Sequence, residues 1–159
     1  MPPAERKRDL RSFGRRRGRK LSPRQAALLE RGLPPVAIGL SQPSPVELGR
    51  LFAPPVAEVW LEIGFGGGEH LAAEALAFPN IGFIGCEPYV NGMAKILAQI
   101  EAHNIANIRL FAGDAAELFA WAPPHSLARI DLIHPDPWPK RRHWKRRFVQ
   151  DATVAAMAR

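Results

Sequence analysis

The sequence contains little cysteine and lacks any long apolar segment. Cys86 is the single cysteine of 159 residues, which excludes a disulfide framework and a cysteine zinc site and favours a reducing compartment. The charged N-terminus has no apolar stretch after it, and no run of about 18 apolar residues occurs anywhere in the chain. We therefore expect a cytoplasmic protein that is neither secreted nor embedded in a membrane.

Patterns of metal ligands are also missing. The histidines are His70, His103, His125, His134 and His143. Their spacing is not that of a metal site, so we expect each to be a surface residue or a satisfied polar residue. We predict no bound metal.

The net charge of +7 is distributed unevenly along the chain. Residues 1–24 hold ten Lys/Arg and two acids, and residues 140–147 hold six Lys/Arg. The remaining residues hold six Lys/Arg and thirteen acids, so an acidic body bears two basic patches. Because a polyanion binds through local clusters of cations that displace its condensed counterions, nucleic acid is the leading candidate partner. For residues 1–20 alone, a solvated and disordered arm is an equally good interpretation.

The first 55 residues contain few strong signals of regular structure. Residues 1–20 have too few apolar side chains to fold alone, which predicts a flexible basic arm. Ser22 as N-cap, Pro23 at the first helical position and Gly32 as a stop predict a short helix. Prolines then recur without a period as far as Pro55, with one possible helical turn at VELGRLF, so residues 21–55 are interpreted as a short helix and a Pro-rich linker.

From Val56 onward, apolar strand-like runs alternate with helical ones. The predicted strands are VAEVWLEIGF, NIGFIGCEP, NIRLFAGD and RIDLIHPD. The predicted helices are EHLAAEALAF, VNGMAKILAQIEAHN, AAELFAW and, after the cationic block of residues 140–147, RFVQDATVAAMAR. This alternation predicts an α/β fold with a mostly parallel, doubly wound sheet of the Rossmann-like kind, formed by residues 56–159. Since such a sheet normally has more strands, we expect it to be incomplete after about four.

An acid stands at the end of each predicted strand. The four acids are Glu62, Glu87, Asp114 and Asp136. Because ligands of a doubly wound sheet bind outside the carboxyl ends of its strands, the acids predict one acid-lined crevice. Glu87, about 20 residues beyond the glycines of GFGGGE, suits the hydroxyl groups of a ribose. Those glycines are typical of a tight turn or of close ligand approach, and we predict that Gly64 and Gly66 border a cofactor.

The glycine-rich run departs from the dinucleotide-binding fingerprint. That fingerprint requires glycine at position 69, where this chain has Glu69. A pyrophosphate would also be repelled by Glu62 and Glu69, which disfavours a nicotinamide-dependent oxidoreductase. An acid-lined pocket suits a cationic ligand without phosphate, such as S-adenosylmethionine with its sulfonium and ammonium groups.

Several segments together resemble one enzyme family. LEIGFGGGEHL, GCEPYVNGM, AGDAAELF and HPDPWPKRRHWKRR are similar to the bacterial tRNA (guanine-N7-)-methyltransferases, which have a class I methyltransferase fold, and the similarity extends to RSFGRRRGRKLSPRQAALLE. The resemblance implies methyl transfer from S-adenosylmethionine to N7 of guanine 46 in the tRNA variable loop. The family pattern continues past the last residue here with further strands, so we expect a truncated methyltransferase domain.

The resemblance also implies roles for individual residues. It implies that Glu62 contacts the methionine end of the cofactor, Glu87 the ribose and Asp114 the adenine. Asp136 would lie between cofactor and guanine, and Lys140 would contact the substrate. Two alternatives remain open, namely a catalytically inactive tRNA-binding fragment and another nucleic-acid base methyltransferase, such as an adenine amino-methyltransferase whose Asn/Asp-Pro-Pro-aromatic loop is similar to DPW.

The predicted chemistry needs few groups. Guanine N7 already presents a lone pair, so no proton has to be removed and catalysis can rest on positioning and electrostatics. Asp136 is predicted to hold the base and offset the positive charge that develops on it. The alternative is that Asp136 caps the following helix.

The residues after Asp136 are also predicted to take part in binding. Trp138 could stack on a base, close the pocket or anchor its loop. The single-sign face of the cationic block predicts phosphate contacts through Arg141, Arg142, Lys145, Arg146 and Arg147.

Overall fold

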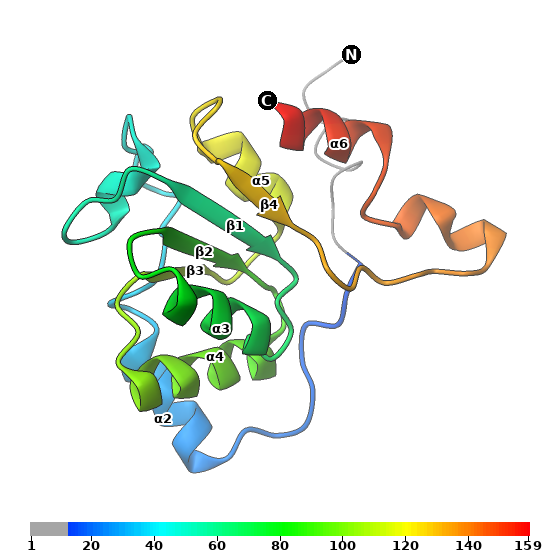
Figure 1. Cartoon of the computed structure of the whole chain (residues 1–159). Coiled ribbons are helices and arrows are strands. Elements are labelled where there is room, and N and C mark those ends of the chain that lie inside the picture. Colours follow the sequence, from blue (N-terminus) through cyan, green and yellow to red (C-terminus); the bar gives the residue numbers. More distant parts are fainter. Residues whose placement is uncertain (1–12) are drawn as a thin grey trace.

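The computed structural model describes residues 13–159, and its centre is a parallel sheet of four strands (Figure 1). The strands are β1 (Val59–Ile63), β2 (Gly82–Cys86), β3 (Ile108–Phe111) and β4 (Arg129–Asp131), in the spatial order β3-β2-β1-β4. The predicted α/β class and the parallel sheet are therefore confirmed. Residues 1–12 of the predicted arm lie outside the described residues.

The strand order creates a binding crevice in a defined place. The chain adds β2 and then β3 on one side of β1, and returns to add β4 on the other side. In register, Leu61 of β1 lies opposite Ile84 of β2 and Ile130 of β4. The order thus reverses between β1 and β4, and such a switch point is where open α/β sheets bind ligands, outside the carboxyl ends of the strands.

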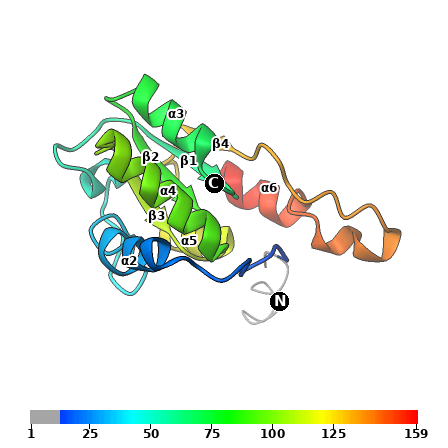
Figure 2. The same ribbon diagram turned by 90° about the horizontal axis from the view of Figure 1, so that it is seen from below.

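Helices cover both faces of the sheet (Figures 1 and 2). On one face, α3 (Glu69–Ala77), α4 (Val90–His103) and α2 (Pro23–Gly32) bury an apolar cluster against the strands, including Leu71, Leu97 and Leu28. On the other face, α5 (Ala115–Trp121) buries Leu118 and lies beside α6 (Asp151–Ala158). Helices on both faces are what the doubly wound prediction requires.

The first described helix begins where the sequence predicts. The Ser22 hydroxyl accepts a hydrogen bond from the backbone N–H of Gln25 (3.2 Å), and the Gln25 side chain accepts one from the backbone N–H of Ser22 (2.9 Å). This reciprocal pair satisfies two N–H groups that the first helical turn would otherwise leave unpaired. The predicted helix over Pro23–Gly32 is confirmed.

The Pro-rich segment after α2 is packed against the sheet. It contains a 3-10 helix, η1 (Leu48–Leu51), within the predicted helical turn. Ala37 forms a parallel bridge with Leu110 of β3, and Ile38, Leu48 and Phe52 are buried in the core. Residues 36–38 thereby cover the outer edge of β3, which would otherwise expose unpaired backbone groups.

The last part of the chain is less regular than the sequence predicts. β4 ends at Asp131, well before Asp136, because the prolines at 135, 137 and 139 supply no N–H group for a strand ladder. Residues 132–140 form a loop that leads to a second 3-10 helix, η2 (Arg141–Arg146). The final helix, α6, begins only at Asp151, where the Gln150 backbone N–H donates to the Thr153 hydroxyl (3.0 Å).

Candidate functional site

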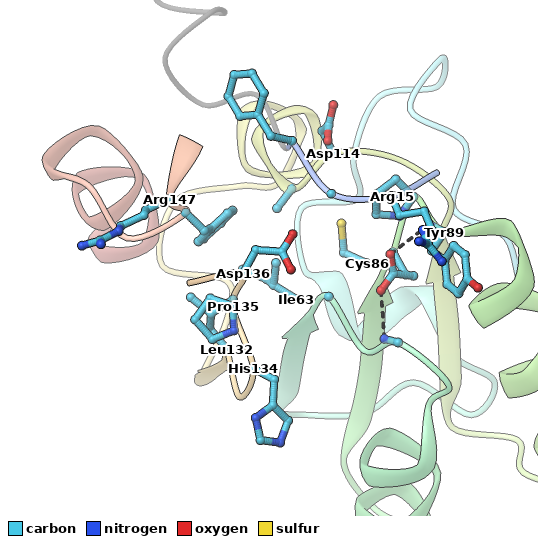
Figure 3. A pocket seen from close by; sticks show the side chains of 18 of the residues that line it. Arg15, Ile63, Cys86, Tyr89, Asp114, Leu132, His134, Pro135, Asp136 and Arg147 are labelled. Atoms are coloured by element: carbon cyan, nitrogen blue, oxygen red, sulfur yellow. Dashed lines mark hydrogen bonds between the residues drawn. The ribbon is translucent and has the colours of Figure 1, made fainter. Parts of the chain in front are cut away.

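A pocket of about 280 Å³ lies at the carboxyl ends of the strands (Figure 3). Its walls come from the ends of β1 and β2, the loop after β3, the loop that follows β4 and the N-terminal residues 13–15. The lining includes Ile63, Cys86, Gly113 and Leu132. The pocket therefore occupies the switch point of the sheet, and segments from both ends of the chain enclose it.

The glycine run after β1 forms one wall of this pocket. Gly64, Gly66 and Gly68 have φ angles of 68°, 57° and 80°, which L side chains rarely adopt. A Cβ on Gly64 or Gly66 would meet nothing within 4 Å, whereas one on Gly68 would lie 2.6 Å from Ile96. Gly68 therefore allows the turn to pack closely against α4. Gly64 and Gly66 leave the space beside the backbone open to a ligand.

The carboxylate of Glu87 is fixed at the pocket wall by two backbone donors. The Gly66 N–H donates to Oε2 (2.8 Å) and the Tyr89 N–H donates to Oε1 (2.9 Å), as the dashed lines in Figure 3 mark. Burial raises the pKa of Glu87, and the two N–H groups oppose that rise. Each oxygen retains a further lone pair, so Glu87 can accept hydrogen bonds from ligand hydroxyl groups.

Asp114, at the start of α5, is buried and only half satisfied. Its Oδ2 is 3.1 Å from Nη2 of Arg16, whereas its Oδ1 is buried without a hydrogen-bond partner among the described residues. A buried carboxylate oxygen without a donor is costly, and a ligand N–H at this point would satisfy it.

Asp136 lies in the loop after β4 and lines the same pocket (Figure 3). Its carboxylate is exposed and points toward the middle of the pocket. The alternative that Asp136 caps the following helix is wrong, because Lys140 occupies the N-cap position of η2 and α6 is capped by Gln150. Glu87, Asp114 and Asp136 thus line one crevice. Asp136 does so from the loop after β4, so its predicted place at the end of a strand is wrong.

A family model described as "Putative methyltransferase" matches residues 56–159, which include most of this pocket. The chain belongs to this methyltransferase family. It is 74% identical over 147 residues to a curated tRNA (guanine-N(7)-)-methyltransferase of Rhodopseudomonas palustris strain BisB18, a match of 92% of this chain and 59% of the relative. Curated proteins of the same name from Nitrobacter hamburgensis and Bradyrhizobium diazoefficiens match over the same length at 71% and 70% identity, and the match covers 58% and 62% of those relatives.

These comparisons confirm the family resemblance that the sequence motifs indicate. The chain spans about three fifths of the length of the curated relatives it matches. A methyltransferase requires a methyl donor, and the acid-lined pocket is the candidate site for it within the described residues.

Glu62 is placed differently from the other three acids. It lies within β1, is buried, and does not line the pocket. Its Oε2 is 2.9 Å from Nδ1 of His70 on α3. Burial raises the pKa of Glu62 and the His70 hydrogen bond opposes that rise, while the same bond raises the pKa of His70. The predicted contact of Glu62 with the cofactor stays a prediction.

The His70–Glu62 pair predicts a pH dependence of stability. A histidine whose pKa is raised on folding stabilises the native state fully below its unfolded value, near 6.5, and loses this contribution as pH rises through the folded pKa. The side chain of His70 is 42% exposed, so we expect less than about 1 kcal/mol after solvent screening. Urea unfolding below and above neutral pH should show that the free energy of unfolding declines as pH rises. His70→Asn should reduce this decline, whereas His103→Asn, an exposed control on α4, should retain it. An equal decline in the parent protein and both variants would contradict the contribution of His70.

The N-terminal segment contacts this site in a way that the sequence did not indicate. The Val90 N–H donates to the Arg16 carbonyl (3.0 Å), and the Gly18 N–H donates to Oδ1 of Asn91 (2.8 Å). Residues 16–19 therefore dock on the first turn of α4, and the Arg16 side chain reaches Asp114. The flexible arm predicted for residues 1–20 includes these docked residues, and its flexibility stays a prediction.

The cationic block projects from the pocket as a basic surface. Its cations are exposed except for Arg146, which is half-buried; the exposed ones are Lys140, Arg141, Arg142, Lys145 and Arg147. Arg146 and Arg147 also line the pocket. Among residues 13–159 no group of three metal-ligating side chains is present, and no helix in this range is long and apolar enough to span a membrane.

Proposed function

We propose that this chain is a cytoplasmic tRNA (guanine-N7-)-methyltransferase that methylates guanine 46 in the variable loop. The observation on which the proposal depends is the position of Asp136, at the centre of a pocket whose wall contains Glu87 and Asp114. The HPDPWPKRR loop that holds Asp136 lies within the region that matches the methyltransferase family. The 74% identity to a curated relative of this name supports the choice of substrate.

The pocket residues suit S-adenosylmethionine as the methyl donor. The unsatisfied Oδ1 of Asp114 would accept a hydrogen bond from the adenine amino group, and Glu87 would accept the ribose hydroxyl groups. The open side of Gly64 and Gly66 would admit the cofactor next to the backbone. When bound, the cofactor supplies a methyl group attached to a positively charged sulfur.

The protein has only to hold the target base in line with that methyl group. Guanine N7 offers its lone pair without losing a proton, so no general base is needed. Asp136 is exposed in the free protein, and a bound nucleotide would exclude water from its carboxylate. A carboxylate in a drier site stabilises positive charge more strongly, which matches the charge that methylation places on the purine.

The basic surface formed by the exposed residues 140–142, 145 and 147 would hold the tRNA backbone. Each phosphate contact adds about 0.9 to the magnitude of the slope of log affinity against log salt on duplex nucleic acid. We expect the double variant R141Q/R142Q to reduce that magnitude by about two. The control is Arg50→Gln, which removes an exposed cation that pairs with Glu47. Filter binding of tRNA across a salt series is the measurement, and an unchanged slope in the double variant would exclude these two contacts.

Borohydride reduction followed by aniline cleavage tests the proposed reaction, because it cuts RNA only where guanine bears a methyl group on N7. Unmodified tRNA is incubated with the full chain and S-adenosylmethionine. One cut in the variable loop is the expected result. No cut, combined with salt-dependent tRNA binding, would contradict transfer and favour an RNA-binding chain without activity. Methyl incorporation without any cut would favour a different target atom.

A further inference from the structure

Trp138 lines the pocket and has a backbone conformation that is unfavourable for a bulky residue. It follows Asp136 by two residues, lines the same pocket and is half-buried. Its φ angle is 39°, and a bulky residue in this region is a conformational outlier of the kind that clusters at binding sites. The His143 ring packs edge-on against the indole, with 5.5 Å between centroids and 88° between planes. The indole of Trp138 therefore packs against His143 from a backbone conformation that an extended loop would not have.

The indole face of Trp138 is covered by a planar cation. The guanidinium carbon of Arg146 lies 5.0 Å from the centroid of the Trp138 ring and 5.8 Å from that of Phe13. Arg146 is the half-buried member of the six cations in residues 140–147, and no carboxylate pairs with it among the described residues. Its environment is thus two aromatic rings, and both rings line the pocket that contains Asp136.

A methylated guanine has the same physical character as this guanidinium. In the proposed reaction the N7 lone pair forms a bond to the methyl carbon, and the carbon–sulfur bond breaks with its electron pair going to sulfur. The sulfonium becomes a neutral thioether, and the purine becomes a flat cation with its charge delocalised over the ring. Aromatic faces attract such cations more strongly than neutral rings, and tryptophan does so best.

We propose that the face of Trp138 is the stacking site of the target guanine and stabilises the positive charge that methylation creates on it. The proposal rests on the proposed function and extends it to a residue that touches the reacting base. Arg146 stands in for the base in the free protein and leaves the indole when the base enters. Phe13, from the N-terminal segment, borders the same space.

Nucleoside binding to the full chain tests the proposal without requiring catalysis. Guanosine and 7-methylguanosine differ by the methyl group and its charge, and neither has a phosphate that could bind the basic surface. With S-adenosylhomocysteine present, at mildly acidic pH where 7-methylguanosine keeps its charge, ligand-observed NMR gives both dissociation constants. We expect 7-methylguanosine to bind about threefold to tenfold more tightly than guanosine.

Variants then assign this preference to one indole. Trp138→Leu should bring the affinity ratio close to one, and Trp138→Phe should keep part of it, because phenylalanine retains a weaker aromatic face. Trp144→Leu is the matched control, since Trp144 also packs against an arginine, Arg147, but is 50% exposed and does not itself line the pocket. Arg146→Gln should strengthen 7-methylguanosine binding, because among residues 13–159 Arg146 alone lies over the indole. Arg50→Gln should not, because Arg50 pairs with Glu47 outside the pocket lining.

Three results would overturn the proposal. The first is equal affinity of the parent protein for 7-methylguanosine and guanosine. The second is a preference for 7-methylguanosine that survives in Trp138→Leu while S-adenosylhomocysteine still binds. The third is no binding of either nucleoside at millimolar concentration. If the preference depends on Trp138 but tRNA is not methylated, the stacking site stands and the proposed function fails. If tRNA is methylated and the ratio is one, the proposed function stands and the stacking site fails.

Discussion

Replacing Asp136 with asparagine is expected to lower the rate of methyl transfer by about 100- to 1,000-fold, the usual cost of removing one preorganised electrostatic group. Asparagine keeps the size of the side chain and removes its negative charge, so the loss would report the charge. Single-turnover methylation of tRNA at saturating cofactor measures this step directly.

A control separates the chemical role from a structural one. Asp151→Asn removes an exposed carboxylate from the first turn of α6, outside the pocket lining, and should leave the rate unchanged. Thermal unfolding of Asp136→Asn should match that of the parent, because the Asp136 side chain is exposed and caps neither following helix. Full turnover by Asp136→Asn would show that the carboxylate is not used in the reaction.

Replacing Gly92 with alanine is expected to distort the pocket through the glycine run that forms one of its walls. Gly92 lies in the first turn of α4, where a Cβ would be 2.0 Å from the carbonyl oxygen of Gly66. Such an overlap forces the helix and the glycine run apart, at a cost of about 1–3 kcal/mol in the free energy of unfolding. Because the Gly66 N–H also holds Glu87, we expect affinity for S-adenosylhomocysteine to fall at least about tenfold.

The matched control is Gly39→Ala, whose Cβ would meet only the Ser41 hydroxyl, at 4.0 Å. Calorimetric titration with S-adenosylhomocysteine and thermal unfolding of both variants measure the two effects. Gly92→Ala with parental affinity and parental stability would mean that α4 and the glycine run adjust without loss, and that their close contact does not shape the pocket.

Much of the fold was predictable because its signals are local. The caps of α2, the helical pattern of α3 and α4 and the apolar runs of β1 and β2 each depend on neighbouring residues. The predicted strand at RIDLIHPD was too long because an apolar pattern does not record the cost of prolines in a strand. Local pattern also gave no sign that residues 36–38 would cover the edge of β3, because that contact joins distant segments.

The sequence by itself determined the fold class, the gathering of Glu87 and Asp114 at one edge of the sheet, and the family. These follow from strand ends and motifs, since parallel strands necessarily bring their carboxyl ends together. Only the tertiary structure decided which distant groups meet: Arg16 with Asp114 and Arg146 with Trp138 at the pocket, and His70 with Glu62 outside its lining. Arg16 and Asp114 are 98 residues apart in the chain. Contacts of this kind depend on how loops and arms cross the folded sheet, which no local periodicity encodes.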